Sequence, residues 1–251
     1  MSRRDLTNEV AIVTGATSRV GAACARALAG EGMRVVCAAR RPERLEQIVS
    51  ELGSDRALAV QRDVRSPTRA GELVAAARRA FGRVDTLVSG VAIGLSGSIL
   101  DHPDDALATM VDTNVTGTVW PIRAVVAEML RGGGGGDIVI LAAAAGLCGT
   151  AGGAVHAATG AAQLALARAL ERELAPRGIR VSAICPAHAP AEGVPDADHA
   201  ADGDGDGDPA GTGRARGPAP DDLADAVVYT LRQPRRLRTG LWTMWSSVEA
   251  G

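Results

Sequence analysis

Large aromatic side chains are scarce in this sequence, since Trp, Tyr and Phe together make up 2% of its 251 residues. A core with so few rings must be assembled from Ala, Val, Leu and Ile. The chain is nevertheless long enough to bury a substantial core as one large domain.

Long apolar runs and an excess of one charge are missing as well. No run reaches the roughly eighteen apolar residues that a membrane-spanning helix needs, and the N-terminus MSRRDLTNEV lacks a signal-peptide core. The 27 basic and 29 acidic residues leave a formal charge of −2, so no whole-chain field attracts nucleic acid or a membrane surface. We therefore expect a cytoplasmic protein with neither of these partners.

Cysteine is also infrequent. Cys24, Cys37, Cys148 and Cys185 are scattered, and three of them lie in apolar runs. This pattern predicts reduced core thiols rather than disulfides or metal ligands. We expect no metal site.

The stretch from Glu9 to Arg41 carries the strongest pattern that is present. An apolar run at 10–13 ends in Thr14-Gly15 and leads through small residues to Gly21, beyond which apolar positions recur at helical spacing. A second run at 35–38 shows no alternation, which is typical of a parallel strand buried on both faces. Strand, glycine turn, helix and strand form the unit that places a dinucleotide's phosphates on a helix N-terminus.

Strands and helices continue to alternate along the rest of the chain. Further strands are predicted at 57–60, 86–88, 138–142, 181–185 and 241–245, and helices at 42–52, 67–81, 104–130, 153–174 and 221–231. This alternation predicts an α/β fold with one doubly wound parallel sheet, in a single domain over residues 1–251.

Two segments are low in complexity. The glycine run 132–136 is predicted to be a flexible surface connection. Residues 189–220 contain DGDGDGDP and almost no apolar side chains, so we expect a mobile loop on the substrate side. The Asp/Gly alternation lacks the distant Glu and the flanking helices of an EF-hand, so it does not indicate calcium binding.

With its elements in this order, the chain resembles the short-chain dehydrogenase/reductase family over nearly its whole length. The motifs that carry the resemblance are TGATSRVG at 14–21, AARRPERLE at 38–46, RDV at 62–64, DTLVSGVA at 85–92, NVTG at 114–117, IVILAAAAG at 138–146, RGIRVSAICPA at 177–187 and PDDLADAV at 220–227. The resemblance implies a Rossmann-like sheet of about seven strands, a nicotinamide cofactor and, usually, a homotetramer. It also implies ketone reduction or alcohol oxidation.

The residues that perform this chemistry in the family are mostly replaced. Ala143 stands at the family's Ser position, His156 at its Tyr position and Gly160 at its Lys position, while the family's Asn is kept as Asn114. An imidazole can exchange a proton near neutrality without a lysine to tune it, so His156 is the candidate catalytic acid/base, with Asn114 beside it. Two other interpretations stay open: His156 has drifted after loss of function, and Asn114 only bridges a helix irregularity.

The cofactor motifs are eroded too. Arg19 stands where the family has the middle glycine of its loop, and it either reaches a phosphate or blocks close approach. Arg40 and Arg41 follow the second strand, and a guanidinium there fits a 2′-phosphate, which favours NADP(H), bound weakly or lost. The predicted cofactor-binding residues are Thr14, Gly15, Arg19, Gly21, Arg40, Arg41, Asp63 and Val64.

Four functions are compatible with these residues. The leading hypothesis is a family member without standard ketoreductase chemistry that serves as a subunit of a homo-oligomer or of an assembly with an intact relative. The second is a biosynthetic cyclase, dehydratase or isomerase acting on a small molecule with His156 as acid/base. The third is an NADPH-dependent ketoreductase with His156 in place of Tyr, and the fourth is an NADP(H)-responsive binding protein. The family resemblance places subunit contacts at about 221–231 and 241–248, where Trp242 and Trp245 supply contact area.

Overall fold

The protein was examined as a computed structural model that describes residues 3–133, 135–149, 151–186 and 217–245. Its centre is a seven-stranded sheet in the order β3-β2-β1-β4-β5-β6-β7, in which every neighbouring pair is parallel. The strands are β1 (Val10–Thr14), β2 (Arg34–Ala39), β3 (Ala57–Gln61), β4 (Thr86–Ser89), β5 (Gly136–Leu141), β6 (Ile179–Pro186) and β7 (Leu241–Met244). The predicted doubly wound α/β fold in a single domain is confirmed.

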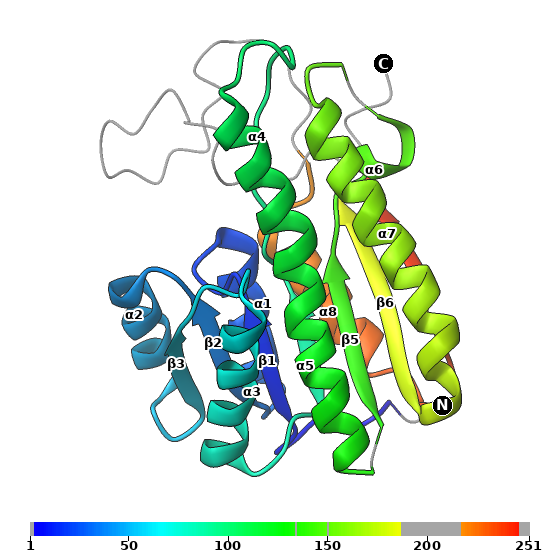
Figure 1. Ribbon diagram of the computed structural model, residues 1–251. Helices are drawn as coiled ribbons and strands as arrows, with labels where there is room; N and C mark the ends of the chain where they lie inside the picture. Colours follow the sequence, from blue (N-terminus) through cyan, green and yellow to red (C-terminus); the bar gives the residue numbers. More distant parts are fainter. Residues whose placement is uncertain (1–2, 134, 150, 187–216, 246–251) are drawn as a thin grey trace.

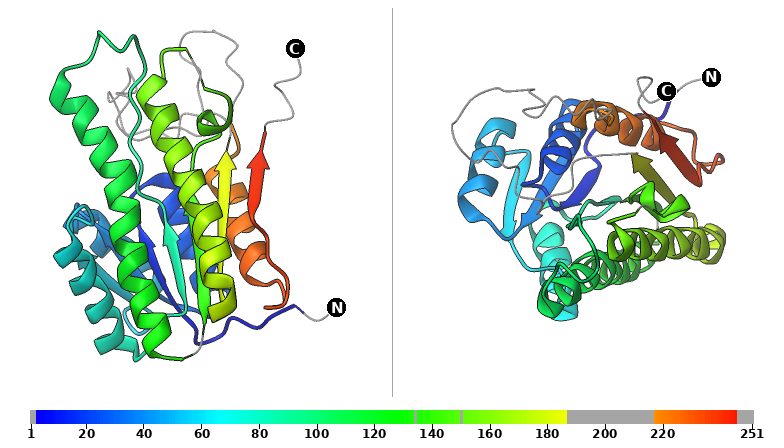
Figure 2. Two further views of the ribbon diagram at one scale, coloured as in Figure 1. Left: turned by 45° about the vertical axis from the view of Figure 1, so that its right-hand side comes forward. Right: turned by 90° about the horizontal axis from the view of Figure 1, so that it is seen from above.

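Helices cover both faces of the sheet (Figures 1 and 2). They are α1 (Arg19–Gly30), α2 (Pro42–Leu52), α3 (Pro67–Phe81), α4 (Asp104–Val111), η1 (Asp112–Thr116), α5 (Gly117–Arg131), α6 (Ala145–Cys148), α7 (Ala154–Leu174), η2 (Ala175–Arg177) and α8 (Pro220–Leu231). The view from above in Figure 2 shows α3, α5 and α7 on one side of the sheet, with α1 and α8 on the other. The first face contains the long helices that carry Asn114 and His156.

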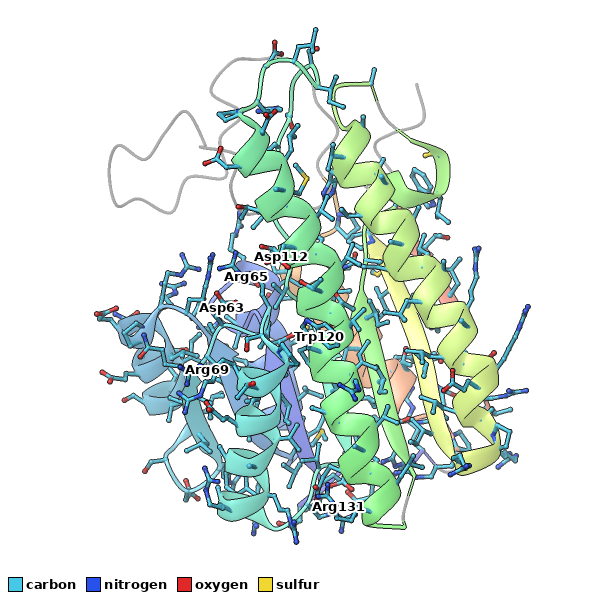
Figure 3. All side chains as sticks on the ribbon, in the orientation of Figure 1. Asp63, Arg65, Arg69, Asp112, Trp120 and Arg131 are labelled. Atoms are coloured by element: carbon cyan, nitrogen blue, oxygen red, sulfur yellow. The ribbon has the colours of Figure 1, made fainter. Side chains whose placement is uncertain are left out.

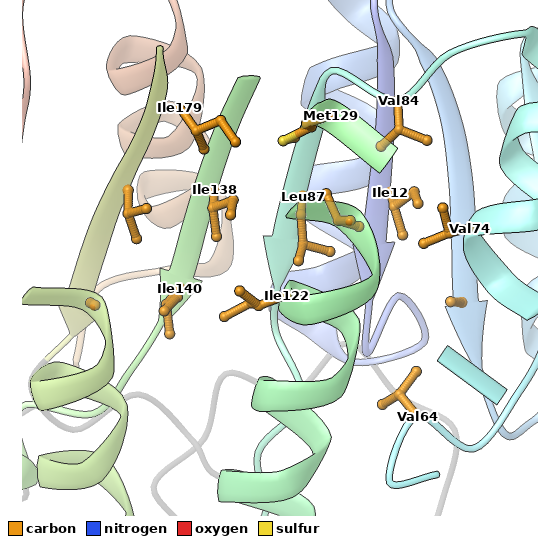
Figure 4. Packing of buried hydrophobic residues seen from close by; sticks show 14 of the residues in the cluster. Ile12, Val64, Val74, Val84, Leu87, Ile122, Met129, Ile138, Ile140 and Ile179 are labelled. Carbon is orange, nitrogen blue, oxygen red and sulfur yellow. The ribbon is translucent and has the colours of Figure 1, made fainter. Parts of the chain in front are cut away.

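The central strands β1, β4, β5 and β6 are buried on both faces, as their lack of alternation predicted, whereas β7 at the edge of the sheet is partly exposed. Ile12, Leu87 and Ile138 belong to the apolar cluster under α3, α5 and α7, which Figure 4 shows from close by. Their strand neighbours Val13 and Val88 belong to the cluster under α1 and α8. Two apolar clusters therefore hold the sheet, one on each face.

Helix α3 shows how local sequence sets an element's ends. Ser66 caps its N-terminus by accepting a hydrogen bond from the backbone N–H of Arg69, and Pro67 takes the first helical position. Gly82 ends the helix in the left-handed region at φ 80°. The predicted bounds, 67 to 81, are confirmed.

Three local predictions differ from the structure. The helix expected at 104–130 contains a π-helical segment, η1, and a short helix, α6, follows β5 where no element was expected. The flexible connection expected at 132–136 is wrong at its end, because Gly136 is the buried first residue of β5. A Cβ at Gly136 would lie 3.0 Å from the Asp85 carbonyl oxygen and would displace the end of the Met129 side chain, so glycine suits this close packing.

A buried ion network fastens the amino edge of the sheet. Arg180 on β6 donates from Nε to Asp137 Oδ1 on β5 at 2.6 Å, and Arg4 donates from Nη1 to the other carboxylate oxygen at 2.6 Å. The Arg180 guanidinium also donates to the carbonyls of Leu231 and Leu237, which flank the connection between α8 and β7. This network ties both ends of the described chain to the start of the central strands.

Most of the predicted loop 189–220 lies outside the described residues; within it, α8 already begins at Pro220. Within the described ranges, no helix combines the length and apolar character that crossing a membrane requires. The same residues bring together no cluster of three His, Cys, Asp or Glu that could hold a metal ion. Cys24, Cys37 and Cys185 are free, buried thiols, as predicted, whereas Cys148 is exposed. Burial raises the pKa of Cys24 and Cys37 to about 12 and that of Cys185 to about 11.

Candidate functional site

Asn114 links three elements at the carboxyl edge of the sheet. It lies in η1, and its side-chain Oδ1 accepts from the Ile93 N–H at 2.8 Å while Nδ2 donates to the Ile93 carbonyl at 2.9 Å. The second N–H of Nδ2 donates to Thr159 Oγ1 on α7 at 2.9 Å. The amide thereby joins the segment after β4 to the helix that carries His156.

His156 lies on the first turns of α7 and is half-buried. Burial lowers the pKa of its imidazole below the ordinary value, and a hydrogen bond with the Ile93 backbone opposes that shift. Its Nδ1 is buried and has no hydrogen-bond partner among the described residues. A neutral imidazole with an uncommitted ring nitrogen can accept or deliver a proton near neutrality.

The backbone carbonyl of Asn114 is used by side chains of the protein itself. Thr118 Oγ1 donates to it at 2.7 Å, and Gln163 Nε2 donates to it at 3.0 Å. Two buried polar side chains therefore bind the carbonyl of a residue that lies in the π segment. The interpretation in which Asn114 bridges a helix irregularity stays a prediction, and these contacts are compatible with it.

Backbone atoms pack closely on Gly160, which stands at the family's Lys position, and one of them is the carbonyl of Ala143 at the Ser position. A Cβ at Gly160 would lie 3.2 Å from Gly146 N and 3.3 Å from the Ala143 carbonyl oxygen. A Cβ at Gly146 would lie 2.4 Å from Ala161 N, so α6 rests directly on the backbone of α7. A longer side chain at Gly160 requires this contact to shift.

Neither a lysine nor a second tyrosine is present in the chain to replace the family's Lys and Tyr. The sequence contains no lysine, and its single tyrosine is Tyr229 on α8. That ring packs edge-to-face on Trp242 with the centroids 5.3 Å apart. Its place is explained by this contact on the C-terminal elements rather than by chemistry at His156.

The glycine loop after β1 keeps its compact form. Gly15 has φ 68°, and a Cβ there would lie 2.4 Å from the Gly90 carbonyl oxygen; a Cβ at Gly21 would lie 2.2 Å from the Gly15 carbonyl oxygen. Both glycines are therefore required by backbone packing alone. Ser18 caps α1 by accepting from the Gly21 N–H at 2.9 Å, and Arg19 is exposed at the first helical position. Thr14 is fully buried and its hydroxyl accepts from the Gly90 N–H at 3.3 Å.

The two arginines after β2 have different surroundings. Arg41 reaches back to the glycine loop, where its Nη2 donates to the Thr17 carbonyl at 3.0 Å and to the Thr17 hydroxyl at 3.1 Å. Arg40 is exposed, and its charge contributes to lowering the pKa of Asp63. Both arginine side chains are exposed.

Asp63, at the predicted adenine side, forms a fork with Arg65. Arg65 Nη2 lies 2.6 Å from Asp63 Oδ2, and hydrogen bonds from Arg65 are the main cause that lowers the pKa of Asp63. The same guanidinium lies 3.9 Å from Asp112, so Arg65 stands between two carboxylates, as Figure 3 shows. Val64 beside them is buried in the core. The pair ties the end of β3 to the helix that carries Asn114.

A separate surface groove of about 560 Å³ lies between α3 and α5. Its walls are small residues such as Gly71, Ala75 and Ala124, with Arg79 and Arg131 among its charged lining. His156 and Asn114 do not line it, so it is not the candidate active site.

Three polar residues near Asn114 were not predicted from the sequence: Thr118, Thr159 and Gln163. Thr159 and Gln163 follow His156 by three and seven positions, which places them on one face of α7. Polar residues on a helix face that is otherwise buried were the available signal, because such groups must find partners inside the protein. The Thr17 contact of Arg41 had no comparable signal.

Comparisons with known proteins agree with this geometry. A family profile described as short chain dehydrogenase matches residues 9–198. An uncharacterized oxidoreductase of Staphylococcus aureus (strain MW2) is 33% identical over 235 residues, which cover 91% of this chain and 93% of that protein. A similar oxidoreductase of Staphylococcus saprophyticus is 32% identical, over 92% of this chain and 94% of its own.

Two solved structures of dehydrogenase or oxidoreductase proteins are also similar to this chain. NAD⁺-bound xylitol dehydrogenase is 30% identical, with a TM-score of 0.71 over 74% of this chain and 73% of its own. A metagenomic short-chain oxidoreductase in complex with NADP, at 24% identity, shares the fold with a TM-score of 0.78 over 96% of this chain and 98% of its own. The chain belongs to the short-chain dehydrogenase family.

Proposed function

We propose that this protein is an NADP(H)-binding member of the family in which proton transfer by His156 has replaced the standard Ser/Tyr/Lys chemistry. The observation that carries the proposal is the half-buried imidazole with an unpartnered Nδ1, held beside an Ile93 backbone that Asn114 fixes. At pH 7 a histidine with a lowered pKa is neutral, so it can serve as a base without a lysine.

The residues around the glycine loop are compatible with a dinucleotide. The N-terminus of α1 faces the compact loop built on Gly15 and Gly21, and a helix N-terminus attracts phosphate. Arg19 and Arg40 are exposed near this loop and add positive charge. Among relatives, the xylitol dehydrogenase was solved with NAD⁺ and the metagenomic oxidoreductase with NADP. When bound, the nicotinamide would donate or accept hydride.

Standard ketoreduction is the chemistry that these residues support least. Ala143 has no hydroxyl to orient a carbonyl, and Gly160 has no group to hold the nicotinamide ribose. General acid–base help is typically worth about 10²–10⁴-fold, and orientation adds to it. Proton transfer at a small-molecule substrate, as in a cyclase, dehydratase or isomerase, asks only for a group like His156.

The test of this proposal uses the reactivity of each histidine. Diethyl pyrocarbonate modifies neutral imidazoles, and peptide mass spectrometry resolves the four histidines of the chain. We expect His156 to react and saturating NADPH to slow its modification, while His102, on the loop before α4, reacts equally with and without NADPH. His156 modification that ignores NADPH would contradict a shared site.

A turnover assay distinguishes the proposed proton transfer from the alternative of NADPH-dependent ketone reduction. NADPH consumption with simple ketones should stay far below ordinary enzyme rates. Consumption at ordinary rates that His156→Ala abolishes would instead establish a reductase in which His156 replaces Tyr.

A second candidate function is that of a subunit in an oligomer, alone or with an intact relative. The last helix and strand expose large apolar side chains: Tyr229 is 46% exposed, Leu237 41%, Leu241 39% and Trp245 56%. Strand β7 is an edge of the sheet, and exposed apolar edges invite pairing with another chain. These features favour an interface with a second family subunit.

Light scattering tests the subunit proposal. The mass should be well above the 25.5 kDa of one chain, and Trp245→Glu should lower it. Leu100→Glu is the matched control, because Leu100 is 89% exposed on the loop before α4, away from β7. A monomer at micromolar concentration, with no relative co-purifying from the native host, would exclude the subunit function.

A further inference from the structure

The Thr159 hydroxyl both accepts and donates a hydrogen bond within the protein. Its hydroxyl accepts from Asn114 Nδ2 at 2.9 Å and donates to the His156 carbonyl at 2.9 Å. The side chain is 3% exposed. One hydroxyl thus connects the Asn114 amide directly to the main chain of His156.

The partner of Thr159 is itself held rigidly. A carboxamide offers two N–H donors and a carbonyl oxygen. Asn114 commits one N–H to Ile93 and the other to Thr159, and its oxygen accepts from the Ile93 N–H. The amide cannot turn without breaking all three hydrogen bonds, so Thr159 has a fixed point to bind.

A second contact between the helices holds η1 in register with α7. Gln163, four positions and about one helical turn after Thr159, donates to the Asn114 carbonyl at 3.0 Å and to Thr118 Oγ1 at 3.1 Å. Gln163 is 4% exposed and Thr118 is fully buried. Buried polar networks whose members are all satisfied fix one arrangement of a core.

Among the described residues, the His156 ring has few hydrogen bonds of its own. Its ring interacts with the Ile93 backbone, and Nδ1 has no partner among the described residues. The main chain at His156 and the Ile93 backbone are both bound through Asn114, one by way of Thr159 and the other directly. The distance between the imidazole and the segment after β4 is therefore set by Asn114 and Thr159.

We propose that Thr159 is a positioning residue that fixes the first turn of α7 against Asn114 and so sets the place of the His156 imidazole. This inference deepens the proposed function, on which it rests. The surroundings of the ring are simple to interpret, because the causes that shift its pKa are burial and the Ile93 backbone, and neither is a charged side chain.

The experiment is an NMR titration of the histidine rings in the full chain, with the His156 signal assigned from His156→Asn. Thr159→Val removes the hydroxyl and keeps the shape, and Thr159→Ser restores the hydroxyl. The matched control is Thr230→Val on α8, because Thr230 is 4% exposed and its hydroxyl donates to a backbone carbonyl of its own helix at 2.8 Å.

Release of the first turn should let water reach the ring, and burial is the larger cause that lowers its pKa. We expect Thr159→Val to raise the apparent pKa of His156 by at least roughly 0.3 unit, while Thr159→Ser and Thr230→Val leave it at the wild-type value. A folded Thr159→Val protein whose His156 titrates as in wild type, or lower, overturns the proposal, as does an equal rise in Thr230→Val. The titration needs neither cofactor nor substrate, so it can succeed even if His156 proves to have no catalytic role.

Discussion

Replacement of Asn114 by alanine tests whether this residue holds the candidate site together. The change removes three side-chain hydrogen bonds and leaves the N–H and carbonyl of Ile93 without their partner. An unsatisfied buried backbone group costs about 1–3 kcal/mol. Ile93 is only half-buried, so water can recover part of that cost, and we expect a loss of about 2–4 kcal/mol.

Thermal unfolding followed by circular dichroism measures this loss. For a domain of this length, 1 kcal/mol corresponds to about 2–4 °C, so Asn114→Ala should lower the Tm by roughly 4–16 °C. Arg123→Ala is the control, because Arg123 is exposed on the adjacent helix α5. If the Asn114 variant melts within about 2 °C of that control, the linking role of Asn114 is refuted.

Further predictions concern the cofactor, the pH dependence of stability and the contact between α6 and α7. NADPH should bind more tightly than NADH in calorimetric titrations, and Arg40→Asp should erase the difference; equal wild-type affinities would contradict the 2′-phosphate assignment. Because the pKa of His156 is lowered in the folded state, the unfolded chain takes up the proton first, so the free energy of unfolding should fall as pH drops below about 6.5. His156→Asn should make that fall shallower in urea titrations at pH 7 and pH 5, and an unchanged slope would count against the lowered pKa. Gly146→Ala should destabilise the protein by more than about 2 kcal/mol in the same assay, because its Cβ would lie 2.4 Å from Ala161 N; near-wild-type stability would show that α6 can move away at little cost.

The fold could be predicted because its signals are local. Unalternating apolar runs marked the buried parallel strands, and Pro67 and Gly82 marked the ends of α3. The π segment at 112–116 could not be found this way, because a single extra residue in a helix barely disturbs the apolar spacing. Helix α6 is four residues long, which is too short for any periodicity.

The candidate site was predicted only in part, because its geometry comes from contacts distant in sequence. His156 and Asn114 could be named from their positions in motifs. Their connection through Ile93 and Thr159 spans 21 and 45 residues, and no pattern in the chain encodes it. Arg41 illustrates the same limit: its contact with Thr17 crosses 24 residues.

The ion network at the amino edge has a consequence for how this protein tolerates change. Asp137 and Arg180 are the second residues of β5 and β6, at the amino edge of the sheet. Ala143, His156 and Gly160 come after the carboxyl end of β5 in the chain. Ala143, His156 and Gly160 are members of neither the ion network nor the two apolar clusters. The residues that anchor the sheet and the residues of the candidate site are therefore different. Residues of the candidate site can therefore be substituted one after another without removal of the buried ion network that anchors the sheet.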